Sequence, residues 1–305
     1  MSTLIELAAE DQRVMLVTSD LGWSVVDGFA REFPDRFLNV GVAEQNMAGL
    51  ATGLARDGMI PYLYSIATFS TMRCYEQFRN GAVLHSLPVR LIGIGGGFAY
   101  GHAGPTHHAL EDLTILRTQP AVTVIAPADQ GQTRSALRAM AQHPGPVYFR
   151  IDKNDRPDLP GLAGRFHPGR PELICPGRDV LLLSTGSVTY EVLKAADQLG
   201  SGGVSAAVAV MAHLPFAPTA ELTAVLSDFP AVLTVEEGST AGGLGSLAAE
   251  AIARGGLTCR ALSLGVCRPL PPLTGSTAYL RRLVGLAPDS IALEAMALIR
   301  RRAVA

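Results

Sequence analysis

The sequence predicts an α/β protein of two domains, the first built on a parallel sheet flanked by helices and the second a further α/β unit. Three observations support this fold class. The 305 residues exceed the usual size of one domain. Strand-like apolar runs alternate with helical patterns along most of the chain. These runs are continuously apolar, which indicates strands covered on both faces, as in a parallel sheet.

The first predicted domain spans residues 1–152. Its strands are expected at 14–19, 37–41, 89–94, 122–126 and 147–151, with helices near 22–32, 44–57, 70–85, 109–118 and 129–142. Residues 153–178 are rich in Pro, Gly and charge, lack periodicity, and are interpreted as a linker. The second domain is expected over 179–305, with strands at 180–186, 204–210, 231–237 and 259–265.

Composition excludes several classes of partner. The net charge is −2 and there is no basic run, so binding to nucleic acid or to an anionic membrane is not expected. No apolar stretch approaches transmembrane length, and the N-terminus lacks the pattern of a signal peptide. Cys74, Cys175, Cys259 and Cys267 are scattered, which is typical of free thiols. We therefore expect a cytoplasmic protein.

The stretch Phe37–Ala55 is the most informative part of the chain. A short apolar strand leads into a helix of small residues, and Glu44 lies in the first turn of that helix. Residues such as Gly49 and Gly53 keep the helix narrow, so another backbone can approach closely. A carboxylate at such a seam is poorly solvated, and its pKa is expected to rise, which would let it share a proton with a ligand nitrogen. Alternatively, Glu44 merely complements the helix dipole.

Three motifs in order carry a resemblance to a known family. Asp20, then G-V-A-E-Q-N at 41–46, then G-P-T-H at 104–107 resemble the pyrimidine-binding half of transketolase. The resemblance is strong over the first 150 residues and looser afterwards. It implies a thiamine diphosphate pyrimidine-binding domain followed by a transketolase C-terminal α/β domain. It also implies that Glu44 contacts the aminopyrimidine ring and drives the tautomerisation that activates the cofactor.

The same resemblance places a clamp for the pyrimidine ring in residues 65–77. Phe69 matches the central aromatic residue, and Ile66 and Met72 stand three positions before and after it. The alternative is an ordinary core helix with Phe69 and Met72 buried together at i, i+3 spacing. Asp20 ends the first strand, where open α/β sheets usually contact ligands, although it could equally be a turn residue.

The glycine-rich loop 93–108 carries the second expected catalytic residue. His107 matches the family histidine that faces the thiazolium and the first substrate oxygens, where an imidazole can hydrogen-bond an alkoxide or relay a proton. His102, earlier in the loop, is assigned to the substrate side. A metal site is disfavoured because adjacent histidines rarely ligate one ion, so we assign no metal ligand among His102, His107, His108, Glu111 and Asp112.

Two features bear on the substrate. The family usually has an Asp before G-P-T-H that binds an acceptor hydroxyl, and here that position is Ala103, so acceptor choice should differ. Lys153 falls where relatives use Arg for a substrate phosphate, and Ser24 matches a second position on the phosphate side. A lysine offers a point charge without a bidentate fork, and Lys153 could also be a plain surface residue.

The family's G-D-G motif and following Asn, which hold the diphosphate through Mg²⁺, are not found. We therefore expect one half of a split enzyme, whose partner subunit brings the diphosphate- and Mg²⁺-binding domain, in an α2β2 assembly. The C-terminal domain is expected to support assembly. Its G-G-L-G motif at 242–245 could hold an anion, but close helix–strand packing is the preferred interpretation.

The resemblance predicts a two-component, thiamine diphosphate-dependent transketolase that moves a two-carbon ketol unit from a ketose phosphate to an aldehyde-type acceptor. Three alternatives stay open. They are the β subunit of a 2-oxo-acid dehydrogenase, a deoxyxylulose-phosphate-synthase-like condensing enzyme, and a non-catalytic assembly subunit.

Overall fold

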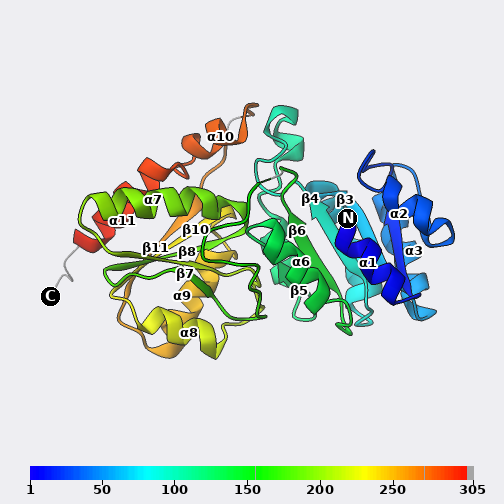
Figure 1. Ribbon diagram of the computed structural model, residues 1–305, viewed down its shortest axis with the longest axis horizontal. Helices are drawn as coiled ribbons and strands as arrows, with labels where there is room; N and C mark the ends of the chain where they lie inside the picture. The colour runs from blue at the N-terminus through cyan, green and yellow to red at the C-terminus, as the bar shows by residue number, and fades with distance from the viewer. Residues whose placement is uncertain (155, 271, 301–305) are drawn as a thin grey trace.

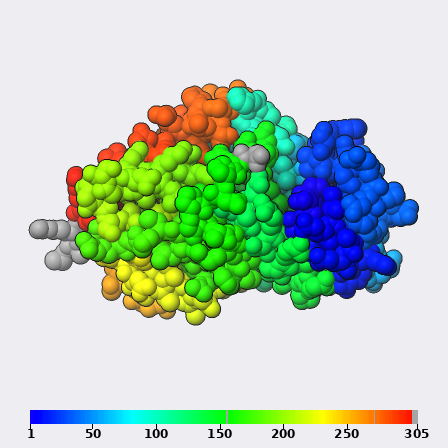
Figure 2. All heavy atoms as spheres, viewed as in Figure 1, coloured from blue at the N-terminus to red at the C-terminus, as the bar shows by residue number. Residues whose placement is uncertain are grey.

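The computed structural model describes residues 1–300 apart from 155 and 271. Two α/β domains lie side by side, the N-terminal one coloured blue to green and the C-terminal one green to red (Figure 1). They pack directly against each other in the space-filling view (Figure 2). The predicted fold class is confirmed. No helix among the described residues is long and apolar enough to cross a membrane.

The N-terminal domain contains a six-stranded, fully parallel sheet in the order β2-β1-β3-β4-β6-β5. Its strands are β1 (Val14–Thr18), β2 (Phe37–Asn39), β3 (Ile60–Ile66), β4 (Arg90–Ile94), β5 (Thr123–Ile125) and β6 (Val147–Ile151). The sequence pattern did not predict strand β3, because it contains Pro61 near its start. A proline lacks the N–H that a central strand donates to its neighbour, so it argues against a strand at this position.

Helices cover both faces of this sheet. Residues of α1 (Ser2–Glu10), α2 (Asp27–Glu32) and α6 (Gln130–Ala139) share one buried cluster with the sheet. Residues of α3 (Glu44–Arg56), α4 (Tyr75–Phe78) and α5 (Asp112–Arg117) share the other. The single helix predicted over 70–85 is instead the short α4 between two π turns, Phe69–Arg73 and Arg79–Val83. Such widened turns are frequent at functional sites.

The C-terminal domain has a mixed five-stranded sheet in the order β11-β10-β8-β9-β7. Its strands are β7 (Glu172–Cys175), β8 (Val180–Thr185), β9 (Ala206–Val210), β10 (Ala231–Ser239) and β11 (Arg260–Val266). Its helices are α7 (Thr189–Ser201), α8 (Ala220–Ser227), α9 (Leu244–Gly255), α10 (Thr277–Leu283) and α11 (Pro288–Arg300). Helices α7 and α11 cover one face, and α8 and α9 cover the other (Figure 1).

The predicted linker 153–178 contains β7, which pairs antiparallel with β9 at the edge of the second sheet. The sequence pattern missed this strand because it is short and lies among Pro, Gly and charged residues. The domain limits at 152 and 179 therefore stay a proposal, and residues 301–305 of the second domain lie outside the described residues.

The N-terminus of α9 carries the G-G-L-G motif, and a side chain of this same chain occupies it. The Glu236 carboxylate accepts hydrogen bonds from the backbone N–H groups of Leu244 (2.9 Å) and Gly245 (2.8 Å). A Cβ on Gly243 would lie 1.9 Å from Glu236 Oε2. Burial raises the pKa of Glu236, against the opposing effect of these donors. The glycines thus allow close packing around an internal carboxylate.

Candidate active site

The carboxyl ends of the parallel strands β1, β3, β4 and β6 meet at one edge of the first sheet, because these strands are neighbours. Ser19 and Asp20 follow β1, Ile66 ends β3, the glycine-rich loop follows β4, and Lys153 follows β6. Ligands of open α/β sheets bind at this edge. The topology therefore gathers most of the predicted site residues there.

Glu44 begins α3 and is buried, with 1% of its surface exposed. Its Oε1 accepts hydrogen bonds from Ser19 Oγ (3.1 Å) and Ser65 Oγ (3.0 Å). Its Oε2 accepts from Arg73 Nη1 at 2.7 Å. Two hydroxyls therefore fix one oxygen within the sheet edge, while the other faces a cationic side chain that is 41% exposed.

The expected rise in the pKa of Glu44 is wrong. Burial acts to raise it, but the hydrogen bond from Arg73, together with backbone and Ser65 donors and the charge of Arg73, outweighs burial. The net result is a pKa below the ordinary value of 4.5. Desolvation could be anticipated from the local sequence, whereas the arginine lies 29 positions further along the chain. Glu44 is therefore ionised at neutral pH.

Phe69 forms a wall beside this carboxylate. The guanidinium carbon of Arg73 lies 4.2 Å from the Phe69 ring centroid, which is a cation–π contact. Ile66 is buried at the end of β3, while Met72 is 39% exposed. The exposure of Met72 argues against the alternative in which Phe69 and Met72 are buried together in a core helix.

His107 packs against the Phe69 ring, although the two residues come from different loops. It ends the 3₁₀ turn Pro105–His107, and its ring meets the Phe69 ring edge-on with centroids 5.0 Å apart. Its Nδ1 lies 2.9 Å from Thr106 Oγ1. Glu44, Arg73, Phe69 and His107 thus form one continuous set of contacts.

A cavity of about 620 Å³ opens at the same edge of the sheet, although Glu44, Arg73, Phe69 and His107 do not line it themselves. Lys153 lines it, with its Nζ 4.2 Å from the centroid of the Tyr100 ring. Ser65 and Ile66 also line it, so it reaches the residues next to Glu44. Ser24 is exposed, in a left-handed conformation with φ of 67°, next to Trp23 in the cavity wall.

Two predicted residues stand apart from these contacts. Asp20 is exposed, accepts from Asn39 Nδ2 (3.0 Å), and donates its own backbone N–H to the Asn39 side-chain oxygen (3.0 Å), which fits the alternative of a turn residue. His102 is exposed on the 3₁₀ turn Gly101–Ala103. No three His, Cys, Asp or Glu side chains in the described part of the chain are grouped to hold a metal ion.

Sequence reasoning missed Arg73, Ser19 and Ser65, which determine the charge state and orientation of Glu44. The signal for Ser19 was its place at the end of a predicted strand, whereas Ser65 lies near the end of β3, which the sequence pattern did not predict. Arg73 lay within the segment assigned to the ring clamp, four positions after Phe69, where a contact across one helical turn is expected.

The fold and the arrangement of these residues define a two-domain α/β protein with a candidate ligand site at the carboxyl edge of its first sheet. Residues 1–157 match the family description "Transketolase, pyrimidine binding domain", and residues 169–291 match "Transketolase, C-terminal domain". The chain belongs to the transketolase family.

Similar proteins point to the split branch of this family. A "Putative transketolase C-terminal section" of Methanocaldococcus jannaschii is 35% identical over 95% of this chain and 92% of that protein. An apulose-4-phosphate transketolase subunit of Phocaeicola vulgatus is 31% identical over 86% of this chain and 85% of that protein. A solved "Split gene transketolase, inactive beta4 tetramer" superposes with a TM-score of 0.86, at 32% identity, over 98% of this chain and 95% of that one.

Proposed function

We propose that this chain is the pyrimidine-binding, catalytic subunit of a two-component transketolase, which transfers a two-carbon ketol unit from a ketose phosphate to an aldehyde-type acceptor. The observation that carries the proposal is the state of Glu44. It is a buried, ionised carboxylate with one oxygen fixed by two serine hydroxyls and the other bound by Arg73, whose guanidinium lies over the Phe69 ring that in turn contacts His107.

The residues present fit the pyrimidine end of thiamine diphosphate. The contacts of Arg73 test this fit. Its guanidinium is planar, donates an N–H to Glu44 Oε2 and lies over the Phe69 ring. A flat heteroaromatic ring bearing a protonated nitrogen needs the same two partners, an acceptor oxygen and an aromatic face. The side chain of Arg73 is 41% exposed, so it can move aside for such a ring. When bound, the cofactor supplies a nucleophilic carbon and an electron sink.

Each residue of the chain then has a limited task. Glu44 would hold the proton of a ring nitrogen at Oε2, and burial strengthens that hydrogen bond by excluding water. Phe69 would pack on the ring face, with Ile66 and Met72 at its borders. His107 would donate a hydrogen bond where negative charge develops on a substrate oxygen.

On the substrate side, Lys153 is proposed to attract the terminal phosphate of the ketose. Its position in the wall of the 620 Å³ cavity supports this, because an ammonium group in a partly enclosed space attracts anions more strongly than one on an open surface. Ser24 and His102 are proposed as further substrate contacts, and Asp20 as a residue that positions the turn before Glu44.

We further propose that a separate subunit supplies the diphosphate site and its Mg²⁺, in an α2β2 assembly. The support is that this chain matches, over 85–92% of their length, relatives named as a transketolase subunit and as a C-terminal section. The cofactor would then lie between unlike subunits.

The test is reconstitution. The chain is co-expressed with a partner that bears G-D-G, and the complex is assayed with D-xylulose 5-phosphate, D-fructose 6-phosphate or apulose 4-phosphate as donor and an aldose phosphate as acceptor. We expect Mg²⁺- and cofactor-dependent ketol transfer that disappears with Glu44→Ala.

Other results would select the alternatives. Decarboxylation of pyruvate without ketol transfer would favour the 2-oxo-acid dehydrogenase or the condensing enzyme. The complex could also be stable and yet transfer no ketol unit from any of these donors, with the wild-type chain and with Glu44→Ala alike. That result would favour a non-catalytic assembly subunit.

A further inference from the structure

The loop that carries His107 belongs to the first domain but is held by the second. We call residues 97–110 the histidine loop. It leaves the end of β4 and closes on itself through paired backbone hydrogen bonds, Gly97 N–H to Ala109 O (2.9 Å) and Ala109 N–H to Gly97 O (3.0 Å). Figure 1 shows it in teal, rising beside the orange α10 of the C-terminal domain.

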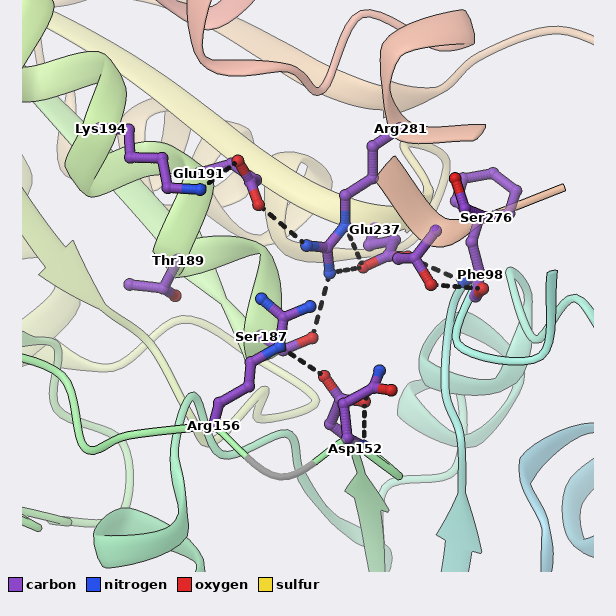
Figure 3. A network of polar contacts seen from close by, with 12 residues as sticks. Phe98, Asp152, Arg156, Ser187, Thr189, Glu191, Lys194, Glu237, Ser276 and Arg281 are labelled. Atoms are coloured by element: carbon purple, nitrogen blue, oxygen red, sulfur yellow. Dashed lines mark hydrogen bonds and ion pairs between the residues drawn. The ribbon is translucent and has the colours of Figure 1, made fainter. Parts of the chain in front are cut away.

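Glu237, near the end of β10, holds the start of this loop. Its side chain is buried, and Oε1 accepts a hydrogen bond from the Phe98 backbone N–H at 2.8 Å (Figure 3). Gly97 lies directly on the same carboxylate, since a Cβ there would be 2.6 Å from Glu237 Cδ. Gly97 also has a φ of +63°, so glycine serves both the turn and the close approach.

The other carboxylate oxygen of Glu237 is fixed by Arg281 of α10. Arg281 Nε donates to Glu237 Oε2 at 3.0 Å, and Nη2 donates to the same oxygen. The guanidinium, 3% exposed, also reaches Ser187 Oγ at 3.1 Å and Glu191 Oε1 at 3.5 Å (Figure 3). Arg281 therefore fixes Oε2 of Glu237, and this orients Oε1 toward the backbone of the histidine loop.

The end of the histidine loop is held by the same part of β10. Ser239 N–H donates to Leu110 O at 2.7 Å. Arg150 Nη2 donates to both Ala109 O and Glu237 O, which joins the loop, the first sheet and β10 at one point.

Helix α10 and the residues just before it add a third set of contacts, to the first part of the loop. Thr277 Oγ1 donates to Phe98 O at 3.1 Å, and Gly275 N–H donates to Gly101 O at 3.1 Å. Phe98 itself is fully buried and meets the His108 ring edge-on. Backbone atoms of the histidine loop are thus tied to the C-terminal domain on both sides of His107.

We infer that Glu237 and Arg281 are positioning residues for His107, so that the C-terminal domain sets the geometry of the active site in addition to any part in assembly. The inference rests on the proposed function for its effect on rate. Its physical basis is that Glu237 binds the loop through a backbone N–H, so it fixes the path of the loop whatever side chains the loop carries. A displacement of about 1 Å at a catalytic group can cost on the order of 100-fold in rate.

Two matched double variants separate this role from the mere presence of a buried ion pair. Glu237→Met with Arg281→Met replaces the pair by apolar side chains and removes the acceptor for Phe98 N–H. Glu237→Gln with Arg281→Gln also removes both charges but keeps an amide oxygen for Phe98 N–H. Replacing both partners avoids leaving one buried charge unpaired. Glu172→Gln is the control, a buried carboxylate of β7 paired with Arg165 and His167.

Two readouts are taken. In the reconstituted complex, the methionine pair should lower kcat roughly 10- to 100-fold with little change in KM, while the glutamine pair and the control stay near wild type. In the full chain alone, with labelled histidine, the methionine pair should shift or broaden the His107 Cε1–H resonance and leave His213 unchanged. The resonance is assigned with His107→Asn.

Equal kcat and an unmoved His107 resonance in the methionine pair would overturn the inference, as would equal losses in both pairs. If the methionine pair does not fold, Thr277→Val decides, because it removes one anchor of Phe98 without touching the ion pair. A His107 resonance unmoved in that variant also overturns the inference. The spectroscopic readout needs no activity, so the inference can fail or stand independently of the proposed ketol transfer.

Discussion

Replacing Arg73 with Met should reverse the pKa shift of Glu44. Burial pushes this pKa up and the hydrogen bond from Arg73 is the first of the groups that bring it down. Met keeps an unbranched apolar stem over Phe69 and removes the donor at 2.7 Å. In the variant, we expect burial to prevail and the pKa of Glu44 to lie above its ordinary value of 4.5.

The size of the interaction follows from its geometry. A hydrogen bond to a charged group contributes about 1.5–3 kcal/mol, and solvent screening lowers this for a partly exposed partner. Because Arg73 is 41% exposed, we expect a coupling free energy of about 1 kcal/mol. The cation–π contact with Phe69 is lost as well, and a double-mutant cycle with Glu44→Gln subtracts it.

The dependence on pH has a definite sign. In the wild type, the folded pKa of Glu44 lies below 4.5, so its stabilisation is complete above pH 4.5 and is lost as pH falls through the folded value. In Arg73→Met the folded pKa is expected above 4.5, so the variant gains relative stability below that pH and loses it as pH rises.

The assay is urea unfolding of the wild type, Arg73→Met, Glu44→Gln and the double variant at several pH values, with the Glu44 carboxyl carbon followed by NMR. We predict a coupling of about 1 kcal/mol at pH 7 that vanishes once Glu44 is protonated. A coupling that is equal at both ends of the pH range, or a Glu44 pKa that stays low in Arg73→Met, would refute the reasoning.

Three further predictions concern catalysis, packing and pH. In the reconstituted enzyme, Glu44→Gln should lower kcat by at least about 100-fold and His107→Asn by about 100-fold, with complex formation retained on size exclusion; full activity of either would remove that residue from its role. Gly97→Ala should destabilise the chain by about 2 kcal/mol, because Gly97 has a left-handed φ of +63°. Gly49→Ala, on the exposed face of α3, should instead stabilise the chain by about 0.5 kcal/mol. Both are measured by urea unfolding, and equal effects of the two variants would contradict the geometry. Burial, and to a lesser degree His143, lowers the pKa of His213 from 6.5 to about 4. The chain should therefore lose up to roughly 3 kcal/mol of stability as pH falls from 6.5 to 4. The variant His213→Gln should reduce this dependence of stability on pH.

The sequence motifs predicted a candidate site because the residue types and the local backbone pattern coincide there. Glu44 begins a helix a few residues after a short strand, and both features are visible in neighbouring residues. The strands of both sheets were predictable from continuous apolar runs, apart from β3 with its Pro61 and the short edge strand β7.

The environment of the site was not predictable, since it depends on residues distant in sequence. The low pKa of Glu44 depends on Arg73, which ends the π turn Phe69–Arg73 and contacts Glu44 at the start of α3. Glu237 lies 139 positions from Phe98, and no local pattern reports such a contact. Local sequence thus predicted the candidate site residues, and tertiary structure decided their charge and orientation.

The proposed function requires Glu44 to bind the pyrimidine end of thiamine diphosphate while a partner subunit binds the other end. Calorimetric titration of thiamine diphosphate with Mg²⁺ into this chain, into the partner, and into their mixture tests it most directly. We predict tight, saturable binding in the mixture alone, weakened by Glu44→Ala. Equally tight binding to this chain without the partner, or binding in the mixture that is indifferent to Glu44→Ala, would contradict it.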